Sequence, residues 1–181
     1  MALGLICAVA LVVESGGEQW SALYVETRLH GDPSVGGLGP AAFAASMVVG
    51  RLAGGEIERR LGERVVLVNG AGLATLGLLT AAAAPSFGVA LVGFALTGIG
   101  ISVAAPTLFG AAGRRAADDD RGSAMAAVTT VSYLGFVAGP PLVGGVSGAF
   151  GLRAGMLLLA GVAVLYGIGA ASSSALGRRG S

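Results

Sequence analysis

Two glutamates near the start of the chain, Glu14 and Glu18, have the clearest potential for chemistry. They are four positions apart, so on a helix both carboxylates lie on one face. A rise of ~1.5 Å per residue places Glu14 about 18 Å from the start of that helix. If the helix crosses a membrane, a charge at that depth costs at least ~2.5–3.5 kcal/mol, and such residues usually face a cavity or a partner. The pair predicts a site that binds and releases a proton or contacts a polar or cationic solute.

A different placement of this helix leaves the glutamates without a special role. If the helix is shifted, Glu18 lies at its watery end and Glu14 is merely solvated. Trp20 and Tyr24 follow one turn apart and are predicted to stack on a solute, although both also suit an interfacial aromatic belt. The Ser15-Gly16-Gly17 segment is expected to weaken the helix, and interrupted helices often mark transporter binding sites.

The composition predicts the environment of these residues. Hydrophobic residues make up 54% of the 181 positions and charged residues only 12%, against about 25% in soluble domains. The mean hydropathy is +0.82. Glycine contributes 33 residues, which suits close helix packing in lipid, and the single Cys7 rules out a disulfide within the chain. These numbers indicate an integral membrane protein and disfavour a disordered tail, a nucleic-acid binder and a disulfide scaffold.

Stretches without charged residues predict the membrane spans. A spanning helix needs about 20 mostly apolar residues, and four uncharged stretches supply five spans because residues 65–113 suit two, joined at Ala84-Pro85-Ser86. A sixth span follows if the first helix continues through Glu14 to about Arg28. A signal peptide would need basic residues at its start, and the sequence has none there. We expect one all-α domain, residues 1–181, with six spans near 3–29, 35–54, 65–84, 87–112, 123–146 and 153–176.

The arginines predict the orientation of these spans, since basic residues accumulate on the cytoplasmic side. With alternate loops on opposite sides, one side carries only Arg28 and Arg153. The other side carries nine arginines, which places both termini in the cytoplasm: Arg51, Arg59, Arg60, Arg64, Arg114, Arg115, Arg121, Arg178 and Arg179.

The segment after the second expected span combines glycines and charges in a recognisable order. Its pattern resembles the cytoplasmic signature of the major facilitator superfamily, Gly-x-Leu-x-Gly-Asp followed by Arg-x-Gly and basic residues, through Gly50, Leu52, Gly54, Arg60, Gly62 and Arg64. The resemblance implies a cytoplasmic gate motif made of Gly50, Arg51, Gly54, Arg60, Gly62 and Arg64. The chain departs from the signature at Gly55, where the family usually has its latching Asp, and at the following Glu56.

Six spans, cytoplasmic termini and the place of this loop resemble the C-terminal half of that family, its helices seven to twelve. The segment 133–142 resembles the Gly-Pro-containing eleventh helix of bacterial members, with Gly135 and Gly139 forming a helix-packing GxxxG pair and Pro140 and Pro141 expected to kink the helix. Leu-Ala-Gly-Gly at 52–55 and Leu-Val-Gly-Gly at 142–145 lie 90 positions apart, as a 3+3 inverted repeat predicts.

The resemblance implies transport of a small solute by alternating access, secondary active and proton-coupled through Glu14 and Glu18. It implies that the first, second, fourth and fifth spans line the path, where Tyr133 joins Trp20 and Tyr24 as a solute contact. No enzyme activity, metal or cofactor is expected. Half a transporter forms one wall of a cavity, so the expected partner is an N-terminal six-helix half or a second copy. Arginine without lysine, with abundant alanine and glycine, points to a bacterial inner membrane.

The sequence also leaves an alternative to transport. The uncharged start favours a truncated chain, and the alternative function is a degenerate six-helix membrane protein that acts at most as an interaction partner. Residues 145–148 match the Gly-x-Ser-Gly site of intramembrane serine proteases, but that mechanism needs a histidine on a later span and the single His30 precedes Ser147. Asp118 to Asp120 are expected to form a solvated loop rather than a cation site.

Overall fold

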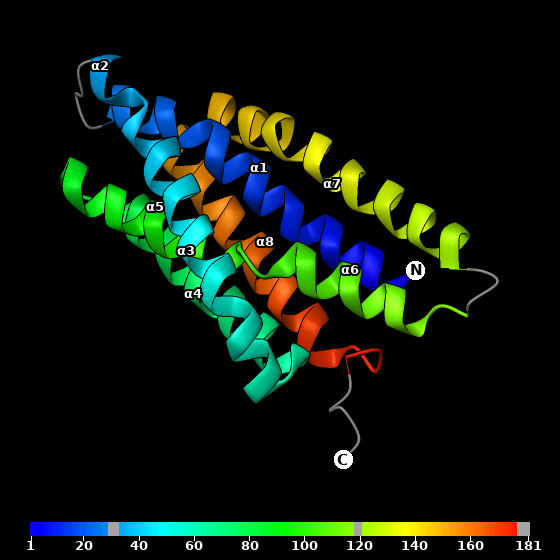
Figure 1. Cartoon of the computed structure of the whole chain (residues 1–181). Helices are drawn as coiled ribbons and strands as arrows, with labels where there is room; N and C mark the ends of the chain where they lie inside the picture. Colours follow the sequence, from blue (N-terminus) through cyan, green and yellow to red (C-terminus); the bar gives the residue numbers. More distant parts are fainter. Residues whose placement is uncertain (29–32, 118–120, 177–181) are drawn as a thin grey trace.

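The computed structural model describes residues 1–28, 33–117 and 121–176, and all regular structure in these ranges is helical (Figure 1). The helices are α1 (Ala2–Arg28), α2 (Pro33–Gly36), α3 (Leu38–Leu61), α4 (Glu63–Ala83), α5 (Phe87–Ile101), α6 (Ala104–Arg115), α7 (Arg121–Phe150) and α8 (Leu152–Ser172). Within the described ranges, five segments are long and apolar enough to cross a membrane: α1, α4, α5 together with α6, α7 and α8. The prediction of an all-helical membrane protein is confirmed at this level.

The second expected span, residues 35–54, differs most from the structure. It lies on α3, which is not among the five segments of the described residues that are long and apolar enough to cross a membrane. α3 continues to Leu61, and its last turns carry two glutamates and two arginines. It stops at Gly62, whose φ of 87° and ψ of 157° only glycine adopts without strain. Arg51 therefore lies within the body of α3 rather than in a cytoplasmic loop.

α1 covers the expected first span and remains helical through Ser15, Gly16 and Gly17. Tertiary packing overrides the low helix propensity of these residues. The Ser15 hydroxyl donates to the Leu11 carbonyl at 2.9 Å. A β-carbon on Gly16 would lie only 3.0 Å from Leu159, so the glycine allows the two helices to approach closely. The segment expected to weaken the helix is therefore continuous helix between Glu14 and Glu18.

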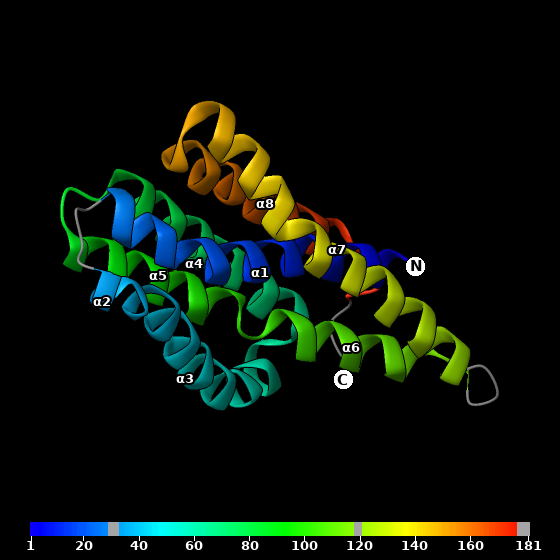
Figure 2. The same ribbon diagram turned by 90° about the horizontal axis from the view of Figure 1, so that it is seen from above.

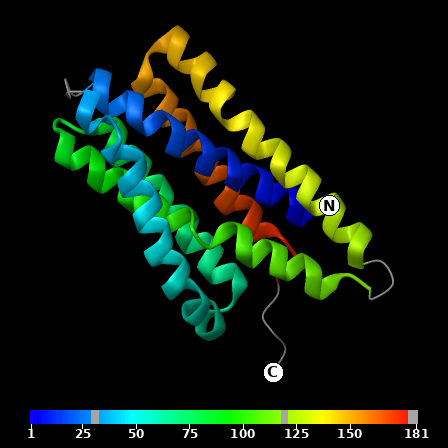
Figure 3. The ribbon, with the colours of Figure 1, turned by 45° about the horizontal axis from the view of Figure 1, so that its top comes forward.

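The fourth expected span, residues 87–112, is divided into α5 and α6 by a turn at Ser102 and Val103 (Figure 3). Pro106 accounts for the division, because it lacks the N–H that would bond to the Ser102 carbonyl in a continuous helix. Regular bonding resumes at Thr107, whose N–H donates to the Val103 carbonyl at 3.1 Å. The loop at residues 84–86 joins α4 to α5 where the sequence predicted a hairpin.

α7 is the longest helix and passes through Pro140 and Pro141 without ending. It extends beyond the expected limit at residue 146 and stops at Gly151, whose φ of 85° again requires glycine. The prolines therefore interrupt hydrogen bonding within one continuous helix, which then turns directly into α8.

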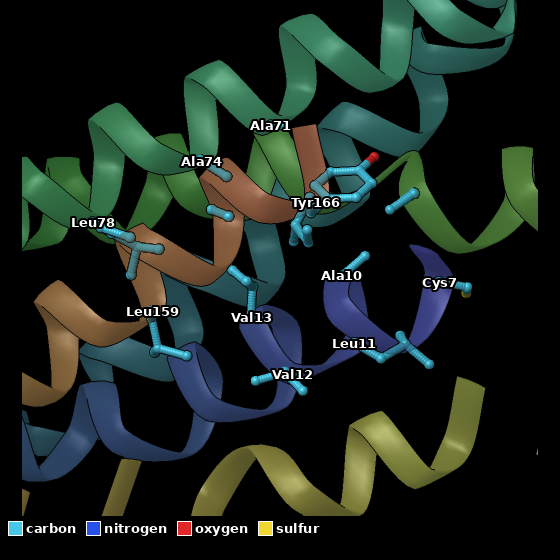
Figure 4. Packing of buried hydrophobic residues seen from close by; sticks show 14 of the residues in the cluster. Cys7, Ala10, Leu11, Val12, Val13, Ala71, Ala74, Leu78, Leu159 and Tyr166 are labelled. Atoms are coloured by element: carbon cyan, nitrogen blue, oxygen red, sulfur yellow. The ribbon is translucent and has the colours of Figure 1, made fainter. Parts of the chain in front are cut away.

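α1 is the central helix of the bundle, with α7 on one side and α3 on the other (Figures 1 and 2). α4 packs against α5 and α8. The core where α1, α4 and α8 meet is built mainly from small or branched side chains; Figure 4 shows Ala10, Val13, Ala71, Ala74, Leu78 and Leu159 in the same core as Tyr166. Such side chains let the helices approach closely, which is how bundles are stabilised in lipid.

Several predicted residues cannot be placed. His30, Asp118 to Asp120, Arg178 and Arg179 lie outside the described residues, and of Arg28 only the backbone is described. The orientation that rests partly on these arginines stays a prediction.

Candidate functional site

Glu14 lies midway along α1 and faces α3. Its Oε1 is 3.5 Å from Nη2 of Arg51, which lies in the middle of α3. The Glu14 side chain is only 14% exposed, whereas that of Arg51 is 50% exposed. An acid at this depth in an apolar helix is stabilised by a neighbouring cation, and Arg51 supplies that cation. The structure thus brings together two residues that the sequence assigned to different sites.

Arg51 has a second contact, with the break between α5 and α6. Its Nε donates to the Ser102 carbonyl at 3.4 Å. That carbonyl is the one that Pro106 leaves without a helical donor. One guanidinium therefore contacts α1 and the α5–α6 turn at the same time.

Glu18 lies one turn beyond Glu14 on α1 and is half-buried. Its backbone carbonyl accepts a hydrogen bond from the Ser21 hydroxyl at 2.6 Å. The spacing of four residues on an unbroken helix places the two acids on one face, as the sequence predicted.

Trp20 connects α1 to the proline segment of α7. Its indole N–H donates to the Pro140 carbonyl at 3.0 Å. Its ring lies so close to Gly144 that an added β-carbon there would be 2.9 Å from Trp20 Cζ2. The polar group of Trp20 is thus already bonded, and one face of the indole is in contact with the α7 backbone.

We expect Gly144→Ala to displace the indole and weaken the bond to Pro140, whereas Gly145→Ala leaves it in place. A β-carbon on Gly145 would meet no atom within 4 Å, so the adjacent glycine is a matched control. A typical hydrogen bond contributes a net 0.5–1.5 kcal/mol, so an effect of about 1 kcal/mol on stability is expected. Because Trp20 is the single tryptophan, its emission maximum and its quenching by acrylamide measure the displacement directly. Equal spectra for both variants would contradict the contact.

Tyr24 is fully buried, unlike a residue that awaits a solute. Its hydroxyl donates to the Ala81 carbonyl at 2.8 Å and lies 3.3 Å from the Ala82 carbonyl. Both carbonyls belong to the last turn of α4, where the Ala81 carbonyl also accepts the Ala84 N–H at 3.1 Å. Its ring packs edge-on against Phe94, with centroids 6.0 Å apart. The structure therefore shows Tyr24 packed against Phe94 and bonded to the end of α4, and its contact with a solute stays a prediction.

Tyr133, the third predicted solute contact, lies on the outer side of α7 and is 57% exposed. Its ring centroid is 6.2 Å from that of Phe136. Leu134 and Val137 are exposed beside it. Tyr133 thus lies on a face of α7 that the described residues leave exposed.

The first residues of the gate motif lie against the α5–α6 break. A β-carbon on Gly50 would be 3.0 Å from the Ile99 carbonyl oxygen, and one on Gly54 would overlap the Val103 side chain. Both glycines are buried, and with Arg51 they place α3 directly against the turn. Small residues at this spacing are what close helix contact requires.

The later residues of the motif lie near the end of α3. Arg60 Nε donates to Glu56 at 2.6 Å within the same helix. Gly62 forms the turn into α4, and Arg64 Nη2 donates to the Ser173 carbonyl, just past the end of α8, at 2.7 Å. The motif thus divides into residues that contact the α5–α6 break and residues that join helix ends.

An ion-pair cluster that sequence reasoning missed joins α3 and α4 to α6. Glu63 is buried and lies 2.5 Å from Arg114 and 3.2 Å from Arg115. Glu58 lies 3.9 Å from Arg114 and accepts a hydrogen bond from the Thr107 hydroxyl at 2.6 Å. The sequence shows the mixed charges of residues 56–64 and the adjacent Arg114 and Arg115. The local pattern around each group did not indicate that the two groups pair with each other.

The predicted packing residues of α7 face α1. A β-carbon on Gly135 would run into the backbone of Ala8, and one on Gly139 would overlap the Ser15 hydroxyl and lie 2.9 Å from the Val12 carbonyl oxygen. Both glycines are buried. Pro140, the next residue, contributes the carbonyl that Trp20 bonds.

Comparison with known proteins decides the family. The sequence profile described as Major Facilitator Superfamily matches residues 3–176. The chain belongs to the major facilitator superfamily. This confirms the resemblance carried by the gate motif. An uncharacterized MFS-type transporter of Yersinia pestis is 37% identical over 87% of this chain and 42% of its own length. The membrane protein MosC of Rhizobium meliloti is 33% identical over 90% of this chain and 40% of its own.

Solved structures of major facilitator transporters share the fold. A peptide transporter, POT, in complex with alafosfalin superposes with a TM-score of 0.83 at 18% identity, over 93% of this chain and 36% of its own. The human organic anion transporter MFSD10 superposes with a TM-score of 0.78 at 20% identity, over 93% of this chain and 40% of its own. The chain spans about two fifths of the length of the curated relatives it matches. It is a multi-pass membrane protein of a transporter family.

Proposed function

We propose that the chain forms one six-helix half of a secondary active major facilitator permease or exporter, which moves a small solute by alternating access and couples it to protons through Glu14. The observation that carries this proposal is the pair of Glu14 and Arg51. A mostly buried acid in the middle of α1 faces a single arginine of α3. Ionisable groups at such a depth usually serve ion or proton pathways. Glu18, Trp20 and Tyr133 are proposed as secondary contacts for solute or proton.

The six spans of the proposal include α3 and are arranged as two inverted repeats of three. Two turns support this arrangement. Gly62 joins α3 to α4 with φ 87° and ψ 157°, and Gly151 joins α7 to α8 with φ 85° and ψ 161°. These are the connections between the second and third spans of each proposed repeat. Equivalent one-residue turns at equivalent places are what a repeat predicts.

We place both termini of this half in the cytoplasm of a bacterial inner membrane. The ion pairs of Arg114 and Arg115 and the contact of Arg64 with the end of α8 gather arginines at one end of the bundle. The excess of basic residues marks that end as cytoplasmic. The remaining wall of the solute path is supplied by an N-terminal six-helix half or by a second copy of the chain.

Transport in membrane vesicles tests this function. Vesicles with and without the protein receive a defined mixture of amino acids, dipeptides, sugars and organic acids under an imposed pH gradient, and mass spectrometry measures the retained solutes. We expect one solute class to accumulate only with the protein and to be lost when a protonophore collapses the gradient. Equal retention in both vesicle types would contradict transport. Accumulation that survives the protonophore would contradict the proton coupling but not the transport. The composition of the detergent-extracted complex separates the two partners: a second copy gives twice 17.5 kDa with this chain alone, whereas an N-terminal half adds a different polypeptide.

A further inference from the structure

The turn between α5 and α6 leaves the Ser102 carbonyl without a donor from its own helix. α5 ends at Ile101 and α6 begins at Ala104, and Pro106 supplies no N–H to the Ser102 carbonyl. An unsatisfied carbonyl in a membrane interior is costly, so a side chain must act as its donor. Arg51 Nε is that donor, at 3.4 Å.

The α3 backbone is fitted to the same turn. Gly50 faces the Ile99 carbonyl and the Ser102 side chain, and Gly54, one turn later, faces Val103. Larger residues at either position would push α3 away and carry Arg51 with it. The position of the guanidinium is therefore set by the contact between α3 and the turn.

The other end of the same guanidinium faces Glu14, with Nη2 3.5 Å from Oε1. An arginine can bond two acceptors through different nitrogens of its planar fork, whereas a lysine presents a single charged nitrogen. Glu18 shares the α1 face with Glu14. Tyr166 of α8 packs against α1 at a place nearer to Cys7 than to Glu14. Among the described residues, Arg51 is the cation that contacts Glu14.

We propose that Arg51 is a positioning residue that couples the charge of Glu14 to the α5–α6 turn. A charged Glu14 draws the guanidinium toward α1 and weakens its bond to Ser102, so the turn opens more readily. A neutral Glu14 leaves the guanidinium to the Ser102 carbonyl and holds the turn closed. This rests on the proposed function only in taking Glu14 as the group whose charge changes during transport.

Hydrogen–deuterium exchange of the full chain in lipid nanodiscs tests the coupling, read from peptides that cover residues 99–108. We expect Glu14→Gln to slow exchange there and Arg51→Gln to accelerate it, each by roughly fivefold or more, the low end of what coupled sites show. In the Arg51→Gln background, Glu14→Gln is expected to have no further effect. Arg59→Gln is the matched control, because Arg59 is exposed on the same helix and pairs with Glu56.

A purely structural role for Arg51 would give a different result. Arg51→Gln would then accelerate exchange, but Glu14→Gln would have the same effect with or without Arg51, which would overturn the proposal. Arg51→Lys guards against misfolding: it keeps a cation beside Glu14 but loses the planar fork that reaches the two acceptors through different nitrogens, so the effect of Glu14→Gln should shrink while α4 and α8 exchange as in the wild type. An undiminished effect in Arg51→Lys would also contradict the coupling. The measurement needs no solute and no proton gradient, so a failure of transport leaves its outcome readable.

Discussion

Replacing Glu14 with glutamine is expected to abolish proton-driven solute accumulation while the bundle stays folded. Glutamine has nearly the shape of glutamate but cannot bind and release a proton. Arg51 loses its ion pair with Glu14, but it is half-exposed and keeps the Ser102 carbonyl, so the cost to stability is small. Accumulation in vesicles should fall to the level of vesicles that lack the protein.

Two controls sharpen this result. Glu56→Gln removes an acid whose ion pairs, among the described residues, are with Arg59 and Arg60 on an exposed face of α3, so transport should continue. Exchange of labelled for unlabelled solute needs no net proton movement, so its survival in Glu14→Gln would show that coupling rather than solute binding was lost. Undiminished accumulation in Glu14→Gln would remove Glu14 from the mechanism.

The largest effect on stability is expected from Gly135→Ala. A β-carbon at this position would meet the carbonyl oxygen, carbonyl carbon and Cα of Ala8. These are backbone atoms of a packed helix and cannot rotate aside, so α1 and α7 must separate. Overpacking of this kind typically costs ~1–3 kcal/mol, which outweighs the gain in helix propensity of about 1 kcal/mol from glycine to alanine.

Gly148→Ala on the same helix is the matched control for this substitution. A β-carbon there would meet no atom within 4 Å, so the same change in propensity occurs without a steric conflict. The temperature at which the detergent-solubilised protein loses its monodisperse elution peak should fall for Gly135→Ala and stay constant or rise for Gly148→Ala. Equal behaviour of the two variants would contradict close packing at Gly135.

The sequence predicts features that depend on local composition and misses those that depend on distant partners. Membrane thickness sets the length of apolar helices, so α1, α4 and α8 lie close to their expected limits. α3 ends at Gly62, beyond the expected limit at residue 54. The mixed charges of residues 56–60 did not indicate that the helix continues through them. The break after Ile101 has a visible cause in Pro106. The side chain that donates to the freed Ser102 carbonyl is that of Arg51, which lies 51 residues before Ser102.

The candidate site shows the same division. The spacing of Glu14 and Glu18 follows from helix geometry and could be read directly. That Glu14 meets Arg51, that Trp20 bonds Pro140 and that Tyr24 bonds the end of α4 follows from contacts between helices, and these pair residues up to 120 positions apart. From sequence alone, a tyrosine or tryptophan near an acid therefore fits a solute contact and a packing role equally well. The two roles are distinguished only when the hydrogen-bond partner of its hydroxyl or indole N–H is known.

The pairing of Glu63 with Arg114 and Arg115 has a consequence for how the protein is made. Glu63 leaves the ribosome at the start of α4, and its first partner follows 51 residues later. Until α6 has been made, Glu63 has no arginine of α6 beside it. Completion of α6 then fixes the end of α3, the start of α4 and the end of α6 to one another, and the order of translation sets the order in which this end of the bundle assembles.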